Sequence, residues 1–315
     1  MSCKGALAKK AAKEVQKYMS SHKGAVIIPK ADMDKMSSSV GSEDMVLLQI
    51  AMYAAKYAEH VVISHYKVGA CVKGKSGNVY LGANFEIPRT LILTVHGEQC
   101  STHHAAVNGE KGLEKIAVNE APCGMCRQFL VELGNPKDLQ VIFCEKNVML
   151  KKPLEDIIPD NFGPQNLGFK GVMLDHPPNS VLATVTTPQE KAALKAAQLS
   201  YTPYTHRPCG ASILFKDGKI IYGLTLENAA YNTGTDAMRN VASLIYFSGH
   251  TPADIVEFCM VEQICCTSAQ RPVSRRPEGQ IIAQALNPNA KFTYISGQPE
   301  PGPVPSPLPT LPLPL

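Results

Sequence analysis

Four residues in the first half of the chain combine metal-binding side chains with a side chain that can move protons. His96 and Glu98 form an H-x-E pair, and Cys123 and Cys126 follow as a C-x-x-C pair. One histidine and two cysteines are ligand types that zinc prefers, and three ligands leave a fourth tetrahedral position open, as in catalytic zinc sites. Glu98 is long enough to transfer protons beside such a metal. The pattern predicts a catalytic site with one Zn²⁺ per chain.

The spacing indicates how these ligands could meet. Cys123 and Cys126 are three residues apart, so on a helix they would share one face and could bind one ion. Pro122 suits the first turn of that helix, because its missing N–H would have had no partner there. Both thiolates would lie at the positive end of the helix, and His96 would begin a second helix directed at the same ion. We expect Arg127 to hydrogen-bond a thiolate and restore some positive field.

Each half of the pattern also has a plainer interpretation. A lone C-x-x-C can be a redox pair or half of a structural zinc site, and a lone H-x-E occurs often by chance. The two pairs in this order, with a proline before the first cysteine, favour the catalytic zinc site.

Composition limits the class of protein. The 315 residues are enough for two domains, and the net charge of +4 is too small to require a nucleic-acid or membrane partner. No apolar stretch is long enough to span a membrane, and residues 1–17 indicate an amphipathic helix or, alternatively, a targeting peptide. Besides the two candidate ligands, Cys71, Cys144, Cys209 and Cys259 lie in apolar, strand-like runs. We therefore expect a reducing, cytoplasmic compartment.

The hydrophobic pattern predicts the elements that hold the site. In chain order these are a helix at about 5–20, a helix over Met45–His60, strands Lys67–Lys73 and Asn78–Asn84, a loop around Pro88, a helix from His96, a strand near Ile116–Val118, a helix from Cys123 to about Leu133, and a strand Leu139–Cys144. This order predicts a three-layer α/β domain with zinc between two helix N-termini at one sheet edge.

An internal repeat divides the chain into two copies. Gly69-Ala70, Gly77, Gly82 and Glu86 recur 141 residues later as Gly210-Ala211, Gly218, Gly223 and Glu227, and His65 recurs as His206. At the same offset the residues of the metal site are replaced by Ala237, Met238, Arg239, Ile264 and Thr267. The adjacent Cys265 and Cys266 would not share a helix face, so they cannot replace the C-x-x-C pair. The second copy is therefore expected to be structural.

The predicted parts of the chain are a helical segment 1–44, a catalytic domain 45–150, a linker 151–188, a degenerate copy 189–296 and a proline-rich tail 297–315. The tail alternates proline with Leu, Val, Ser and Thr, so we expect an extended or disordered segment. It is either dispensable or a ligand for a proline-binding module.

Over roughly residues 40–290 the chain resembles the cytidine deaminases, in the two-domain form that occurs as a homodimer in some bacteria and plants. H-x-E followed by P-C-x-x-C is the signature of zinc deaminases. The resemblance also includes Ser64–Ala70, Gly82–Glu86, Cys123–Phe129, Asp160–Pro164 and Glu227–Asn232. It implies a duplicated three-layer α/β/α sandwich with one catalytic and one degenerate copy.

The resemblance also implies roles for single residues. His96, Cys123 and Cys126 would hold zinc and Glu98 would shuttle protons. Asn84 and Glu86 would hydrogen-bond the ribose, and Tyr66 stands where the family usually has phenylalanine against the pyrimidine ring. Two departures are Gly97, usually alanine or valine, and Ala121, usually serine or threonine. Gly97 loosens the helix start by about 0.5–1 kcal/mol relative to alanine. The role at 121 belongs to a backbone carbonyl facing the leaving ammonia, so we expect little loss.

The expected activity is hydrolysis of free cytidine and deoxycytidine to uridine and deoxyuridine in pyrimidine salvage. One alternative is a deaminase of cytosine in a polynucleotide, but the chain has no tryptophan and little excess charge for a stacking, basic groove. Another is a zinc-stabilised binding protein without catalysis, against which Glu98 argues. By analogy we expect a homodimer in which Asn228–Asn232 approaches the partner's active site. The alternative is that the second half only covers an apolar face of the first.

Overall fold

A computed structural model describes residues 1–22, 24–88, 90–134, 136–170, 172–264 and 273–299. These residues form two compact units. The first contains Met1–Asp160 and Ser243–His250, and the second contains Asn161–Ala242 and the described part of Thr251–Leu315. Cys265, Cys266, Thr267 and the tail from residue 300 onward lie outside the described residues.

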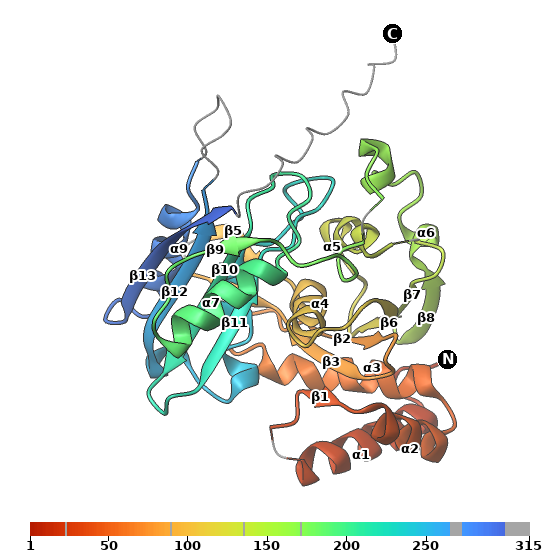
Figure 1. Cartoon of the computed structure of the whole chain (residues 1–315). Coiled ribbons are helices and arrows are strands. Elements are labelled where there is room, and N and C mark those ends of the chain that lie inside the picture. Colours follow the sequence, from red (N-terminus) through yellow and green to blue (C-terminus); the bar gives the residue numbers. More distant parts are fainter. Residues whose placement is uncertain (23, 89, 135, 171, 265–272, 300–315) are drawn as a thin grey trace. The chain divides into compact units, whose positions relative to one another are not determined.

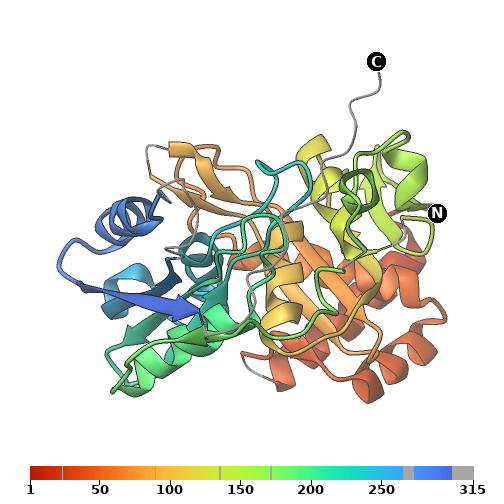
Figure 2. The ribbon, with the colours of Figure 1, turned by 45° about the horizontal axis from the view of Figure 1, so that its top comes forward.

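The main sheet of the first unit has six strands in the order β1-β3-β2-β6-β7-β8. Their bounds are β1 Ile27–Ile28, β2 Gly69–Gly74, β3 Val79–Ala83, β6 Leu113–Val118, β7 Gln140–Glu145 and β8 Val148–Pro153. The helices are α1 Ala6–Ser21, α2 Lys30–Val40, α3 Glu43–Ala54, α4 Gly97–Val107, α5 Gly124–Leu130 and α6 Leu154–Ile157. A separate hairpin, golden in Figure 2, pairs β4 Phe85–Ile87 with β5 Thr90–Val95.

Helices cover both faces of this sheet (Figure 1). Helix α3 packs on β2 from one face, with α1 and α2 behind it, and α4 packs on β2 and β3 from the other face. A Cβ atom on Gly82 would lie only 2.2 Å from the backbone nitrogen of Ser101 in α4, so the close approach of this helix requires glycine. The predicted three-layer α/β/α arrangement is confirmed.

The second unit has a five-stranded sheet in the order β11-β10-β12-β13-β9. The strands are β9 Val181–Leu182, β10 Cys209–Phe215, β11 Ile220–Leu224, β12 Ile255–Gln263 and β13 Lys291–Pro299. The helices are α7 Pro188–Leu199, α8 Ala237–Ser243 and α9 Arg276–Leu286. The Thr187 hydroxyl caps α7 by accepting a hydrogen bond from the Glu190 N–H, 3.2 Å away.

The topology of the two sheets confirms the duplication. In the first unit β2 is antiparallel to β3 and β6, and β6 is parallel to β7. In the second unit β10 is antiparallel to β11 and β12, and β12 is parallel to β13. A Cβ atom on Gly223 would lie 2.4 Å from the backbone nitrogen of Val241 in α8, the same close approach that Gly82 allows. His65 and His206 both have positive φ, 54° and 52°. The repeated residues therefore preserve backbone geometry.

Several elements differ from the expectation. The loop around Pro88 is the β4–β5 hairpin, and the stretch expected as a linker contains part of β8, α6 and β9. Strand β13 runs to Pro299, so sheet structure extends three residues into the stretch from Gly297 expected to lack it, because Gln298 and Pro299 pair with β9. The sequence boundaries of the five predicted parts stay predictions.

The N-terminal residues correct the expectation for Cys144. Cys144 forms a disulfide with Cys3 instead of remaining a free thiol. Two backbone hydrogen bonds bring the segments together, Cys3 N to Asn147 O and Met149 N to Met1 O. The short extended N-terminus thus pairs with the β7–β8 connection, which the sequence pattern does not reveal. Cys71, Cys209 and Cys259 are free and buried, as expected for thiols in apolar strands.

None of the helices in the described part of the chain is long and apolar enough to cross a bilayer.

Candidate active site

The predicted metal ligands come together in the first unit. The ligand atoms of His96, Cys123 and Cys126 lie within 4.8 Å of one another, and His96 Nδ1 is 3.5 Å from Cys123 Sγ. A tetrahedral zinc with Zn–N of about 2.1 Å and Zn–S of about 2.3 Å would place a nitrogen and a sulfur about 3.6 Å apart. The three side chains therefore fit one zinc ion, and they leave room for a fourth ligand.

Two helix N-termini supply these ligands. His96 caps α4, and its backbone N–H donates to Gln99 Oε1 at 3.0 Å. Cys123 caps α5, whose first helical residue is Gly124. Pro122 therefore precedes the helix instead of lying in its first turn, and only Cys126 of the two cysteines is inside the helix. The positive ends of both helices still face the site, as predicted.

The contacts between the ligands favour negative charge on Cys123. A hydrogen bond from the Cys126 thiol and a smaller contribution from His96 lower the pKa of Cys123 to about 3, against the effect of burial. The same contact, together with burial, raises the pKa of Cys126. Zinc binds the thiolate form of cysteine, so the arrangement prepares Cys123 for coordination.

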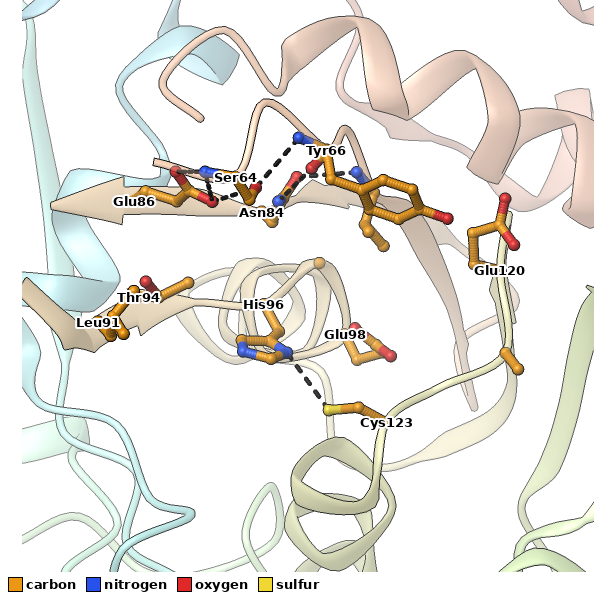
Figure 3. Close-up of a pocket in the computed structure, with 13 residues that line it drawn as sticks. Ser64, Tyr66, Asn84, Glu86, Leu91, Thr94, His96, Glu98, Glu120 and Cys123 are labelled. Atoms are coloured by element: carbon orange, nitrogen blue, oxygen red, sulfur yellow. Dashed lines mark hydrogen bonds between the residues drawn. The ribbon is translucent and has the colours of Figure 1, made fainter. Parts of the chain in front are cut away.

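Glu98 lies beside the ligands (Figure 3). It is only 3% exposed, and it accepts a hydrogen bond from Cys126. Burial raises the pKa of Glu98, and the negative charge of Cys123 acts in the same direction, whereas His96 acts in the opposite one. A raised pKa brings a carboxyl group closer to the range in which it can both accept and donate protons near neutral pH.

These residues line one pocket of about 600 Å³, within the usual size range of small-molecule sites. The wall consists of Ser64, Tyr66, Val68, Asn84, Glu86, Leu91, Thr94, His96, Gly97, Glu98, Glu120, Ala121 and Cys123. Figure 3 shows Ser64 and Glu86 at one end of the site and Glu120 at the other, with His96 and Glu98 between them. All predicted site residues except Cys126 and Arg127 belong to this wall.

The two predicted ribose ligands also hold the pocket wall. Glu86 is buried, and its carboxylate accepts hydrogen bonds from the backbone N–H of Ile63 and from the N–H and hydroxyl of Ser64. Burial alone would raise the pKa of Glu86, but these hydrogen bonds lower it below the usual value. The Asn84 side chain accepts from Val68 N at 2.9 Å and donates to Tyr66 O at 2.8 Å. Both side chains therefore fix the loop that faces the substrate.

Tyr66 lies at the open end of the pocket, with 56% of its surface exposed. Its ring extends toward Glu120 (Figure 3), and burial, followed by the charge of Glu120 and a hydrogen bond to it, raises the pKa of Tyr66. Glu120, Leu91 and Thr94 were not among the predicted site residues. Glu120 stands two residues before Pro122, and this closeness to the C-x-x-C motif could have indicated a place in the site. Leu91 and Thr94 lie on the hairpin that was expected to be a loop, so no sequence signal indicated them.

Arg127 supports the site through the backbone. Its Nε donates to Pro122 O at 2.8 Å and its guanidinium donates to Ile157 O at 3.0 Å. These bonds fix the turn before Cys123, and the expected bond to a thiolate stays a prediction. Ala121 lines the pocket, as its predicted backbone role requires. A Cβ atom on Gly97 would have ordinary contacts of 3.4 Å or more, so the glycine there is not required by space.

The second unit has an ion-pair network at the position of the metal site. Gly82 faces Gly97 and Ser101, whereas Gly223 faces Ala237 and Val241, so the offset has fallen to 140 at these helices. The counterpart of His96 is therefore Asp236 and not Ala237, and that of Glu98 is Met238 and not Arg239. A single-residue deletion between Gly223 and α8 accounts for the change in offset from 141 to 140.

Asp236 forms an ion pair with an arginine. Arg275 Nε lies 3.1 Å from the Asp236 carboxylate, and its Nη2 lies 3.3 Å from Glu227, the counterpart of Glu86. Glu227 also accepts hydrogen bonds from the backbone N–H groups of Tyr204 and Thr205, matching the bonds of Ile63 and Ser64 to Glu86. The Arg275 guanidinium thus lies inside the second copy. Glu227 keeps its hydrogen bonds to the loop there, although the described residues of the second unit contain no cluster of metal ligands.

The fold and the site together define a zinc-dependent hydrolytic enzyme. Family models described as the cytidine and deoxycytidylate deaminase zinc-binding region match residues 41–143 and 154–275, one in each copy. The cytidine deaminases of Salmonella newport and Salmonella typhi are each 33% identical over 246 residues, which cover 78% of this chain and 82% of theirs.

Two solved structures are similar to part of the chain. A cytidine deaminase from Burkholderia pseudomallei is 30% identical, with a TM-score of 0.34, and the match covers 37% of this chain and 96% of that one. One from Mycobacterium tuberculosis is 29% identical, with a TM-score of 0.33, covering 37% and 94%. The chain belongs to the zinc-binding cytidine and deoxycytidylate deaminase family.

Proposed function

We propose that this enzyme hydrolyses free cytidine and deoxycytidine to uridine and deoxyuridine with release of ammonia. One observation carries the proposal: a single pocket joins the metal-ligand cluster, the buried Glu98 and the polar groups Asn84 and Glu86. A nucleoside has a base to react and a sugar to be recognised, and the pocket has a separate region for each. Relatives at 33% identity carry the name cytidine deaminase.

His96, Cys123 and Cys126 would hold the zinc, which when bound supplies Lewis-acid activation of water. Glu98 would accept a proton from the attacking water and deliver it to N3 of cytosine while the water oxygen bonds to C4. Glu98 would then pass the second water proton to the amino group, and the C4–N bond would break to release ammonia. The water supplies both protons and the new carbonyl oxygen, so the reaction needs no other reactant.

Asn84 and Glu86 would bind the ribose, and Tyr66 would pack against the pyrimidine. Because the carboxylate of Glu86 is held by Ile63 and Ser64, it is already directed before a sugar hydroxyl arrives. Such preorganisation reduces the ordering that binding must otherwise cause.

The charge of the pocket favours a free nucleoside. Three of its described lining residues are Glu86, Glu98 and Glu120, and none is lysine or arginine. A phosphate group at the sugar would meet negative charge without a compensating cation, which disfavours nucleotides and polynucleotides. This observation supports the nucleoside over the alternative of cytosine in a polynucleotide.

The test is an absorbance assay of the purified zinc enzyme with cytidine, deoxycytidine, CMP and a cytosine-containing oligonucleotide. We expect turnover of both nucleosides and at least about a hundredfold lower kcat/KM for the two phosphorylated substrates, the effect of roughly 3 kcal/mol of lost binding. Preference for the oligonucleotide would contradict the proposal, and lack of any turnover would favour the non-catalytic alternative.

We also propose that the enzyme is a homodimer in which the Asn228–Asn232 segment approaches the partner's active site. Tyr231 of this segment is 63% exposed, and on the hairpin beside the pocket Leu91 and Ile92 are 76% and 81% exposed. Apolar surface of this kind is typical of an interface. Light scattering is expected to give about twice the chain mass of 34.0 kDa. A mass of one chain at micromolar concentration would contradict the dimer.

We further propose a cytoplasmic enzyme of pyrimidine salvage. Six described cysteines are free thiols, which supports a reducing compartment. The Cys3–Cys144 disulfide is the opposing observation, because disulfides persist mainly in oxidising compartments. The backbone hydrogen bonds from Cys3 and to Met1 hold the same segment, so its position would survive reduction.

A further inference from the structure

A short segment of the second half of the sequence packs within the first unit. Ser243–His250 follows helix α8 and groups with the catalytic unit, whereas the residues on either side group with the second unit. Leu244, Ile245 and Phe247 of this segment are buried and Tyr246 is half-buried. The sheet of the second unit does not need this segment, and the contacts of its two aromatic side chains lie in the first unit.

Phe247 contacts the helices that flank the site. Its ring stacks on Tyr57, with centroids 4.5 Å apart and planes 20° apart, and it lies 5.9 Å from the ring of His104 in α4. Cys100 of the same helix hydrogen-bonds the backbone carbonyl of Ser243 at 3.6 Å. The segment thereby contacts two parts of the first unit. One is α4, which carries His96 and Glu98 at its N-terminus, and the other is the stretch around Tyr57 that follows α3.

Tyr246 contacts a pair of rings next to Glu86. Its ring centroid lies 6.5 Å from His60 and 6.4 Å from Phe85. His60 and Phe85 stack on each other, with centroids 4.7 Å apart and planes 11° apart. The three rings form an aromatic cluster that includes Phe85, the neighbour of Glu86 on β4, and Tyr246 is the member contributed by the second half of the sequence.

The cluster is joined to the pocket wall by hydrogen bonds. His60 Nδ1 donates to Glu86 O at 2.7 Å, and Glu86 N donates to His60 O at 2.8 Å. The Glu86 carboxylate in turn accepts from Ile63 N at 2.5 Å and from Ser64 N at 3.1 Å. Displacement of the His60 ring would therefore move both the backbone of Glu86 and the loop that its carboxylate closes.

We propose that Tyr246 is a positioning residue for substrate binding: by packing against His60 and Phe85, it fixes Glu86 and the Ile63–Ser64 loop in the geometry that receives the sugar. This rests on the proposed nucleoside deaminase function. It gives Tyr246, a residue of the second copy by sequence, a defined task, which is to hold in place two residues of the pocket wall, Ser64 and Glu86. Tyr246 touches neither the metal ligands nor the pocket interior, so its effect falls on binding and not on proton transfer.

The test compares Tyr246→Ala with the wild-type zinc enzyme. We expect KM for cytidine to rise roughly three- to tenfold, the effect of losing one or two aromatic contacts, while kcat changes less than about twofold and zinc content stays the same. Tyr246→Phe keeps the ring and should restore the wild-type KM. Tyr222→Ala, which removes another half-buried tyrosine from β11 of the second unit, is the matched control and should leave KM unchanged.

Amide hydrogen exchange gives a readout independent of catalysis. The Ile63 and Ser64 N–H groups should exchange at least about tenfold faster in Tyr246→Ala than in the wild type or Tyr222→Ala, because looser Glu86 packing lowers their local opening free energy. Failure of the wild type to deaminate cytidine would overturn the proposed function, yet this exchange difference would still report the positioning. The positioning role is overturned if exchange and KM are unchanged, or if kcat and zinc content fall while KM rises. Should Tyr246→Ala not fold, Tyr246→Leu applies the same two criteria.

Discussion

Replacing Glu98 by glutamine is expected to abolish turnover while the protein keeps its zinc. Glutamine has nearly the same size and can occupy the same buried position, but it cannot accept the proton from water. One carboxylate would serve several proton transfers in succession, and each such transfer typically contributes 10²–10⁴-fold. We therefore expect kcat to fall by at least about 10³-fold, measured with cytidine by the change in absorbance.

The matched control for Glu98→Gln is the same substitution at a carboxylate outside the site. Glu114 on β6 is exposed and forms an ion pair with Lys73, at 3.3 Å, so Glu114→Gln should retain full activity. Zinc content should be equal in the two variants, because Glu98 is not one of the three clustered ligands. Near-normal turnover of Glu98→Gln would remove Glu98 from the mechanism, and loss of zinc would show that it contributes to metal binding.

The metal cluster could be predicted because coordination chemistry restricts both residue type and spacing. A His, an adjacent acid and a C-x-x-C pair have few joint uses, and the helix termini that hold them follow from local sequence signals. The exact helix start was less predictable. Pro122 is compatible both with the first helical turn and with the residue before the cap, and only the structure shows Cys123 to be the cap.

The pocket wall could be predicted only in part, because it is made by contacts between distant residues. Ser64, Asn84 and Glu86 are close through hydrogen bonds across the β3–β4 region and the loop before β2, and no local pattern encodes those pairings. Leu91 could be assigned to the pocket wall only if the stretch around Pro88 were known to be a hairpin. The Cys3–Cys144 disulfide could not be predicted for the same reason, since it joins residues 141 positions apart.

The repeat was visible because glycine is needed wherever a helix crosses a strand closely. Gly82 and Gly223 both satisfy that requirement, and this conserves their spacing within the two copies. The connection from the strand to the next helix has no such constraint on its length, so a one-residue deletion there leaves no signal in the sequence. The segment Ser243–His250, at the end of α8 and after it, groups with the first unit.

The second large effect is expected from removing one metal ligand. Cys123 is preferable to Cys126 for this purpose, because Cys123 is exposed at the helix cap whereas Cys126 is fully buried. Cys123→Ala should therefore leave the packing of α5 intact and remove only a thiolate. With two remaining ligands the site cannot complete the three-residue set of a catalytic zinc centre, so zinc should be lost on dialysis together with activity.

Atomic absorption should give one zinc per chain for the wild type and close to none for Cys123→Ala. Cys265→Ala is the appropriate control, because Cys265 and Cys266 form the adjacent cysteine pair of the second copy. That variant should keep both its zinc and its turnover. Two zinc ions per wild-type chain, or loss of one in Cys265→Ala, would contradict a structural second copy. One zinc retained by Cys123→Ala would show instead that the ion is held by groups other than the His96, Cys123 and Cys126 cluster.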